Sequence, residues 1–475
     1  MADENFFPVT LWYSTLGMGD GHDYATRGYL RALMQVGFSG LRIPPSISTS
    51  VLMLDEEADP DITQFASLTR PPVEMRMKPM TLIKAGDPRI GTTKVIPGTD
   101  MRGESKPMEV KITEGSIDLD VEQEYMSKEV QEVRSVVIHH DPASIARHFT
   151  TLTKQGRPDK VGYVGVTVWE TSHIPEAVAV ILNELNGLVV PSEHTQQAFL
   201  ASGVDIDIDV VRHTFDPKRW SEPTEAELER PKGREKYVFY AIATPIERKN
   251  LRGLIRAYFK AFEGRQDVIL RVKTSGQKAE IAEVAKQALE ESGINAGRRP
   301  PFKVFSGNWA TEKIRAFHLD GDCYVSACRA EGFGLCELEA KLCGSRVITS
   351  EWGAAKEFIE YQEVTHLDPM TGNPYRAPIG HEATTGQDVL VPCKLIDVDN
   401  MYGIGCYETD QQWADPDEDA LVAAMRRAAR ERLGPDREAW GRLRRELAYE
   451  KIGAELGAVI LRAREAAEEE SGNDF

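Results

Sequence analysis

Apolar runs of strand length alternate with helical patterns through most of the chain, and this alternation constrains the fold more than any other feature. The run Val136–Ile138 precedes a helical stretch at Ala143–Thr153, and Tyr237–Tyr240 precedes an amphipathic one at Leu251–Phe262. Alternating segments of this kind are typical of βαβ units, whose strands form a parallel sheet. The sequence therefore predicts an α/β protein.

The alternation runs in two series, and 475 residues are enough for two hydrophobic cores. A polar segment with little periodicity separates them, and a stretch rich in Pro, Met and charge interrupts the first. Two Rossmann-like domains of this type bind ligands at the carboxyl ends of their strands. The expected organisation is a first domain at 1–218 with an insertion at about 46–132, a linker at 219–235, a second domain at 236–440, and a C-terminal helix with an acidic tail at 441–475.

The composition favours a cytoplasmic protein without a metal site. No apolar run approaches the ~20 residues that span a bilayer, and the acidic start at 1–5 is unlike a secretory signal. The six cysteines fit neither a disulfide framework nor a paired zinc motif. The net charge of −18 opposes binding to phosphate polymers. However, the segment 70–111 carries nine basic and five acidic residues, either as a solvated insertion or as a surface for an anionic acceptor.

The strongest chemical signal is the segment Glu331–Glu339, in which a glycine-rich turn precedes a helix. Glycines let backbone N–H groups approach a ligand closely, and a helix N-terminus favours negative charge. A carboxylate in such a turn can accept hydrogen bonds from sugar hydroxyls, and a second one further along the helix can reach a ribose. The alternative is that these glutamates lie at the start of a helix without contacting a ligand, because acidic residues are favoured at that position anyway.

This segment resembles the donor-binding core of glycosyltransferase family 4, whose members are retaining enzymes of the GT-B fold. The residues Glu331 and Glu339 match the Glu-x7-Glu motif of that family. The resemblance implies two Rossmann-like parallel-sheet domains facing a cleft, with a C-terminal helical segment. It also implies that Glu331 faces the transferred sugar and Glu339 the donor ribose. The backbone N–H groups of Phe333, Gly334 and Leu335 would line the sugar and phosphate.

A second match to the family lies at 245–250, before the amphipathic helix. Lys249 occupies the position at which the family uses a lysine for the donor diphosphate, and a lysine is a point charge suited to that role. Many members carry Gly-Arg six residues earlier, where this chain has Ala243. Arg248 is the candidate for the missing charge. The alternative for Lys249 is a solvated loop residue.

The first domain offers three further candidates. The loop 16–22 is glycine-rich, so Gly19 and Gly21 are expected to face the donor. The strand end at 139–140 resembles the family's strand-end histidine near the donor sugar, with His140 preferred as a catalytic residue and His139 as the alternate. Glu170 is expected at another strand end facing the cleft. Structural roles, such as a hydrogen-bonded histidine or a helix cap, compete with each of these.

The resemblance implies a metal-independent hexosyltransferase with Glu331, His140 and Lys249 as catalytic residues. No cofactor is expected besides the donor, a nucleotide sugar such as a UDP- or GDP-hexose. The acceptor is expected to be a hydroxyl of a glycan, a lipid-linked sugar or a protein. One alternative is a DNA glycosyltransferase acting on hydroxymethylated bases, with nucleic acid the less favoured partner. Another is a non-catalytic sugar-binding protein of the same fold.

Overall fold

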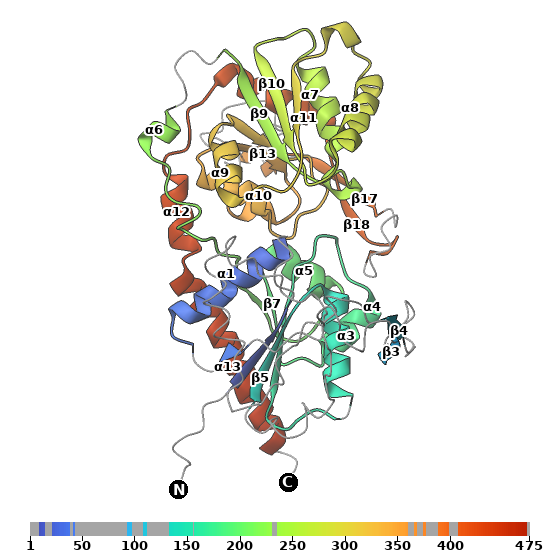
Figure 1. Cartoon of the computed structure of the whole chain (residues 1–475), viewed down its shortest axis with the longest axis vertical. Helices are drawn as coiled ribbons and strands as arrows, with labels where there is room; N and C mark the ends of the chain where they lie inside the picture. Colours follow the sequence, from blue (N-terminus) through green and yellow to red (C-terminus); the bar gives the residue numbers. More distant parts are fainter. Residues whose placement is uncertain are drawn as a thin grey trace, which may run out of the picture.

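Two parallel sheets, one in each half of the chain, organise the computed structural model (Figure 1). The structure describes residues 9–14, 21–38, 41–42, 93–96, 108–111, 133–154, 156–229, 235–359, 365–367, 374–376, 388–398 and 407–472. Within these residues each parallel sheet has six strands, and three two-stranded antiparallel pairs accompany them. With the C-terminal helix described below, this is the two-domain GT-B architecture, and it confirms the α/β fold expected from the sequence.

The N-terminal sheet has the strand order β2-β1-β5-β6-β7-β8, with every pair parallel. Its strands are β1 (Val9–Tyr13), β2 (Leu41–Arg42), β5 (Val133–His139), β6 (Gly162–Val166), β7 (Gly187–Val190) and β8 (Ile208–Val210). Its helices are α1 (Gly21–Gln35), α3 (Pro142–Thr153), α4 (Glu176–Leu182) and α5 (Glu193–Ala201). β6 and β7 are buried along their whole length, because helices cover both faces of the sheet. Within the expected insertion the structure describes only the hairpin of β3 (Thr93–Ile96) and β4 (Met108–Lys111).

The C-terminal sheet has the order β11-β10-β9-β12-β13-β16, again all parallel. Its strands are β9 (Tyr237–Ile242), β10 (Val268–Lys273), β11 (Phe302–Phe305), β12 (Cys323–Val325), β13 (Arg346–Ser350) and β16 (Val389–Val391). Its helices are α7 (Leu251–Ala261), α8 (Lys278–Ser292), α9 (Thr311–Leu319), α10 (Leu335–Leu342) and α11 (Glu418–Glu431). The chain order changes direction between β9 and β12. Ligands of open α/β sheets bind at such a switch point, beyond the carboxyl ends of the strands.

Shorter elements complete this half of the molecule. They are α6 (Glu225–Leu228) within the expected linker, the 3-10 helices η3 (Glu247–Lys249), η4 (Ala296–Arg298) and η5 (Ala354–Glu357), and the pairs β14 (Thr365–Leu367) with β15 (Pro374–Arg376) and β17 (Cys393–Asp397) with β18 (Gln412–Pro416). The amphipathic pattern at 251–262 is confirmed as α7, which buries Leu254, Ile255 and Tyr258 in the core of this domain. The helix α6 begins with a capping box between Thr224 and Glu227.

The end of the chain returns to the first domain. The charged pattern beyond residue 436 forms two helices, α12 (Ala439–Glu446) and α13 (Tyr449–Gly472), rather than one. α13 lies beside α1 and the N-terminal sheet in Figure 1. Its residues Ile452, Leu456 and Val459 share a core cluster with Trp12 and Val164. The C-terminal helix is therefore part of the N-terminal hydrophobic core.

Gly453 lets α13 approach α1 closely. A Cβ at this position would lie 2.1 Å from the carbonyl oxygen of Ala32 in α1, far inside van der Waals contact. We expect Gly453→Ala to lower the free energy of unfolding by about 1–3 kcal/mol through overpacking. Chemical denaturation measures this change. The matched control is Gly441→Ala in α12, whose Cβ would lie 3.7 Å from the Arg445 guanidinium. The control should be neutral or slightly stabilising, because alanine favours a helix.

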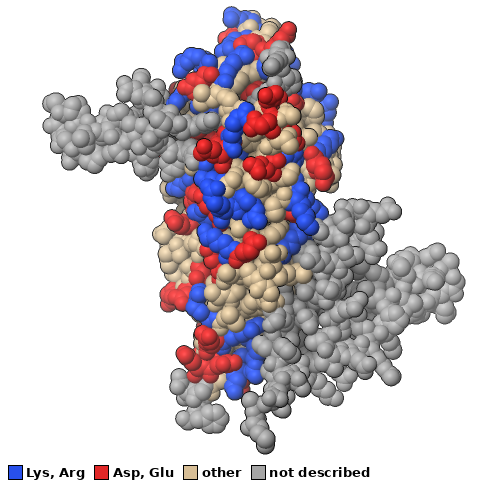
Figure 2. All heavy atoms as spheres, turned by 90° about the vertical axis from the view of Figure 1, so that its left-hand side faces the viewer, with Lys and Arg blue, Asp and Glu red and all other residues tan. Residues whose placement is uncertain are grey.

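Charges of both signs share the face of the molecule that carries α6, α9 and α12. Figure 2 shows Lys and Arg side chains interspersed with Asp and Glu on this face. One such pair joins Arg315 of α9 to Glu227 of α6 at 2.6 Å. Most of the basic segment 70–111 lies outside the described residues, so its expected role stays a prediction. Among the described helices, none combines the length and the apolar character needed to cross a bilayer.

Candidate functional site

Two loops meet at the switch point of the C-terminal sheet. After β9 the chain forms η3, which carries Arg248 and Lys249, and Asn250 then takes a left-handed conformation (φ 44°) and caps α7 by accepting from the Gly253 N–H. After β12 the chain forms the glycine-rich turn that begins at Glu331. The backbone N–H of Arg329 donates to the Arg248 carbonyl at 2.7 Å, which ties the two loops together. This geometry brings together the predicted residues Glu331, Lys249 and Arg248.

Glu331 lies between two cations. Lys249 donates a hydrogen bond to its Oε1, and Arg248 Nη1 lies 3.4 Å from its Oε2. Burial alone would raise the pKa of this carboxyl, but the charges of Lys249 and Arg248 outweigh it and lower the pKa to about 2. Burial likewise opposes the charged form of Lys249, while Glu331 raises its pKa. Both groups are therefore ionised at neutral pH.

Arg248 also connects the two domains. Its Nη2 lies 3.3 Å from Glu170, which follows β6 of the N-terminal sheet, and its Nη1 donates to the Ala330 carbonyl at 2.7 Å. Tyr407 donates its hydroxyl to the other oxygen of Glu170 at 3.0 Å, and its ring stacks on Trp169. Glu170 thus lies at the strand end where the sequence places it, and its partner is Arg248.

The glycine-rich turn contacts the N-terminal domain directly. Ser192 donates its hydroxyl to the Gly332 carbonyl at 2.7 Å, and Thr195 donates to the Trp169 carbonyl at 3.0 Å. A Cβ on Gly332 would lie 2.2 Å from Val168 and 2.7 Å from the Trp169 carbonyl oxygen. Only glycine permits this approach, so the turn is shaped by the domain contact as well as by any ligand.

The same turn starts α10. Gly334 is the N-cap residue in a left-handed conformation (φ 93°), with no side chain capping the helix. Leu335 is the first helical residue, and the Phe333 ring packs edge-on against His213 at 4.7 Å. The first N–H groups of a helix have no acceptor within the helix and carry its positive end. Phe333, Gly334 and Leu335 thus surround a helix N-terminus beside Glu331, and their contact with a donor stays a prediction.

Glu339 lies one turn further along α10, toward the first domain. Its Oε2 is 3.5 Å from His318 Nε2. Burial raises the pKa of the Tyr24 hydroxyl in α1, and the nearby charge of Glu339 raises it further. The first turn of α1, which begins at Gly21, is therefore close to Glu339. Gly19 lies outside the described residues.

The two strand-end histidines have different surroundings. His139 is buried, its Nδ1 forms a hydrogen bond of 2.9 Å with Thr26, and its ring contacts those of Trp12 and Tyr29. The His140 ring is half-buried and lies 5.2 Å from that of His148 on α3. Among the described residues, no hydrogen bond, ion pair or ring contact joins either histidine to Glu331, so a catalytic role for His140 stays a prediction.

Ala243 stands where many members of glycosyltransferase family 4 carry Gly-Arg. It packs against the hydrophobic core of its own domain. The sequence offers Arg248 as the replacement cation. In the structure Arg248 forms ion pairs with Glu170 and Glu331. A diphosphate bound here would therefore compete with these two carboxylates for the Arg248 guanidinium.

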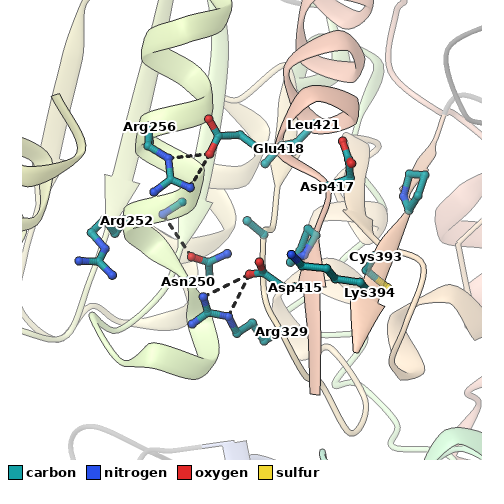
Figure 3. A pocket seen from close by; sticks show the side chains of 14 residues that line it. Asn250, Arg252, Arg256, Arg329, Cys393, Lys394, Asp415, Asp417, Glu418 and Leu421 are labelled. Atoms are coloured by element: carbon teal, nitrogen blue, oxygen red, sulfur yellow. Dashed lines mark hydrogen bonds and ion pairs between the residues drawn. The ribbon is translucent and has the colours of Figure 1, made fainter. Parts of the chain in front are cut away.

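A cavity of ≈ 400 Å³ opens beside this cluster, at the start of α7 (Figure 3). Arg329 pairs with Asp415 at 3.2 Å across it, and Arg256 pairs with Glu418 at the start of α11. None of Glu331, Lys249 and Arg248 lines it. Residues from β18 and α11 were not among the sequence candidates, because only the tertiary fold brings them to α7.

No protein-family model matches the chain, and no curated protein matches it. Solved structures of glycosyltransferases are similar at low identity. HepE from Anabaena in complex with UDP is 13% identical, with 70% of this chain and 80% of that chain covered and a TM-score of 0.48. A TarM mutant from S. aureus, in complex with Fondaparinux, alpha-GlcNAc-glycerol and UDP, is 13% identical, with 69% of this chain and 55% of that chain covered and a TM-score of 0.44. The pneumococcal O-GlcNAc transferase GtfA in complex with UDP and GlcNAc is 12% identical, with 72% and 57% covered and a TM-score of 0.42. The chain thus spans little more than half the length of TarM and GtfA.

Proposed function

We propose that this protein is a retaining glycosyltransferase that takes a hexosyl group from a nucleotide sugar and transfers it to an acceptor hydroxyl. The observation that carries the proposal is the half-buried cluster of Glu331, Lys249 and Arg248 at the switch point of the C-terminal sheet, beside the N-terminus of α10. A carboxylate can hold sugar hydroxyls, and cations and a helix N-terminus can bind a diphosphate.

In the proposed reaction the bond between the anomeric carbon and the diphosphate oxygen breaks, and the electron pair leaves with the diphosphate. Lys249 and the N-terminus of α10 stabilise the charge that develops there. The acceptor oxygen attacks from the same face, and its proton passes to the departing phosphate oxygen. Glu331 holds the hydroxyls of the transferred sugar. The cations of the protein supply the charge neutralisation, so the proposed mechanism is metal-independent.

Ligand binding tests the first part of this proposal. Nucleotide sugars with different bases and hexoses are screened by thermal shift against the whole chain. A donor at about 100 times its dissociation constant should add about 2.7 kcal/mol of stability. The hit is then incubated with glycan, lipid-linked, protein and hydroxymethylated-DNA acceptors, and released nucleoside diphosphate is measured. A protein that binds a nucleotide sugar but never releases the diphosphate would be the non-catalytic binder.

We expect Glu331→Gln to lower kcat for diphosphate release by roughly a hundredfold, because the variant loses a charge-assisted contact to the sugar that strengthens in the transition state. Glu283→Gln on the exposed surface of α8 is the matched control and should leave kcat unchanged. Full turnover by Glu331→Gln would remove the catalytic assignment of this residue.

A further inference from the structure

Glu337 is a buried carboxyl in the first turn of α10 that the proposed reaction does not use. Acidic residues in a first helical turn are usually solvated, but Glu337 is only 1% exposed. Its Oε1 has no hydrogen-bond partner within the described part of the chain. A buried oxygen without a partner is costly when the group is ionised, so this carboxyl needs a physical explanation.

The carboxyl of Glu337 folds back under the glycine turn. The Ser326 hydroxyl after β12 and the N–H of Glu337 itself lower the pKa of this carboxyl, but burial outweighs them. Its Oε2 lies 3.2 Å from the point where a Cβ on Gly334 would be. The group therefore lies at the same positive helix end that the proposed function assigns to the donor diphosphate.

The groups that face Glu337 come from β12, η3, the glycine turn and α10 itself; they are Tyr324, Ser326, Cys328, Glu331, Lys249 and Cys336. Burial raises the pKa of the Cys328 thiol to about 12, so it stays neutral. Burial and then the ionised Glu331 raise the pKa of Glu337 to about 7. Two carboxylates in one buried region rarely both ionise.

We propose that Glu337 is the proton-binding residue of the donor site, where its neutral form leaves the N-terminus of α10 to the diphosphate and its ionised form opposes it. The inference rests on the proposed function, because it takes the diphosphate as the ligand of this helix end. Glu337 acts through α10 and Glu331, so it is a positioning residue.

Proton linkage determines the direction in which donor affinity should change with pH. A bound diphosphate adds negative charge beside Glu337 and makes its proton harder to remove, so the protonated protein binds the donor more tightly. Donor affinity should then be constant at low pH and fall as the pH rises through the titration of Glu337. One linked proton changes affinity by at most about tenfold per pH unit.

The test measures the affinity of the whole chain for UDP-glucose, UDP-GlcNAc and GDP-mannose between pH 6 and pH 8.5. The esterified diphosphates of these probes have no proton that titrates in this range. The variant is Glu337→Gln, which keeps the shape of the side chain and mimics its neutral form. The matched control is Glu312→Gln, which changes an exposed acid in the first turn of α9. Unfolding by urea at each pH checks that all three proteins are folded.

We expect the wild type and Glu312→Gln to lose about tenfold in affinity between pH 6.5 and pH 8.5, while Glu337→Gln keeps its low-pH affinity throughout. Identical pH profiles for the wild type and Glu337→Gln overturn this inference and leave the proposed function standing. If the folded wild type binds none of the nucleotide sugars even at pH 6, the proposed function fails, and this inference fails with it.

Discussion

Lys341→Met should lower the free energy of unfolding by about 3–5 kcal/mol, the typical cost of removing one partner from a buried ion pair. Lys341 is fully buried in α10, and its Nζ lies 2.9 Å from Asp388 and 2.8 Å from Asp436. Methionine fills a similar volume but leaves two carboxylates without their cation. Urea denaturation at pH 7 measures the loss.

The pH dependence of Lys341→Met separates a charge effect from a packing defect. In the wild type, burial raises the pKa of Asp388 despite Lys341, whereas in the less buried Asp436 the attraction of Lys341 outweighs burial and lowers the pKa. Without the lysine, both folded-state pKa values should rise above those of the unfolded chain. The variant should then be most stable at acid pH and lose stability as the pH rises toward neutrality, so its deficit should be larger at pH 7 than at pH 5.

A second substitution provides the control for that charge effect. Asp388 also accepts the backbone N–H of Val347 at 2.9 Å, a bond that asparagine can keep. Lys341→Met with Asp388→Asn should therefore recover part of the lost stability. A double variant that is less stable than Lys341→Met alone would show that the deficit comes from packing.

Lys249→Ala should reduce kcat/KM for sugar transfer by about 10²–10³-fold, the usual cost of deleting one preorganised group that stabilises transition-state charge. The same variant should bind the donor more weakly, because Lys249 is a principal cation for the diphosphate in the proposed site. Diphosphate release under single-turnover conditions separates the two effects. Lys286→Ala on α8 is the matched control, since Lys286 is 64% exposed and pairs only with Glu283 of its own helix among the described residues.

Lys249→Arg tests whether the site needs only a positive charge or also the hydrogen-bond directions of a lysine. Lys249 is enclosed between Glu331 and the loop that carries Cys328, where a planar guanidinium has different hydrogen-bond directions. We expect partial recovery of donor binding and little recovery of turnover. Wild-type activity in Lys249→Ala would contradict the proposed role of this residue.

Local pattern was enough to predict the framework of both domains. The spacing of Leu254, Ile255 and Tyr258 predicts α7, because amphipathic periodicity is a property of consecutive residues. The same holds for the turn at Gly334, where a positive φ calls for glycine. The loops at 245–250 and 331–339 were expected to bind one donor because both resemble donor-binding segments of glycosyltransferase family 4, and the structure adds that both follow strands at one switch point.

The contacts between domains could not be predicted in this way. The sequence favours a ligand-facing role for the glycine turn, and the structure adds that Gly332 packs against Val168 of the other domain. The pairing of Arg248 with Glu170 and Tyr407 joins three distant segments, and no periodicity encodes it. Glu337 resembles an ordinary acid at a helix start in the sequence, and only its burial distinguishes it.

The return of α13 to the first domain bears on how the chain is made. Ile452, Leu456 and Val459 complete the hydrophobic core that begins at Trp12. During synthesis the first domain cannot complete its core until α13 has been made. The domain that starts at β9 has all its strands before that point. We therefore expect the second half to acquire protease resistance first in a nascent chain. The first domain is not a contiguous fragment, so a gene cut in the linker would yield a first domain with an open hydrophobic face.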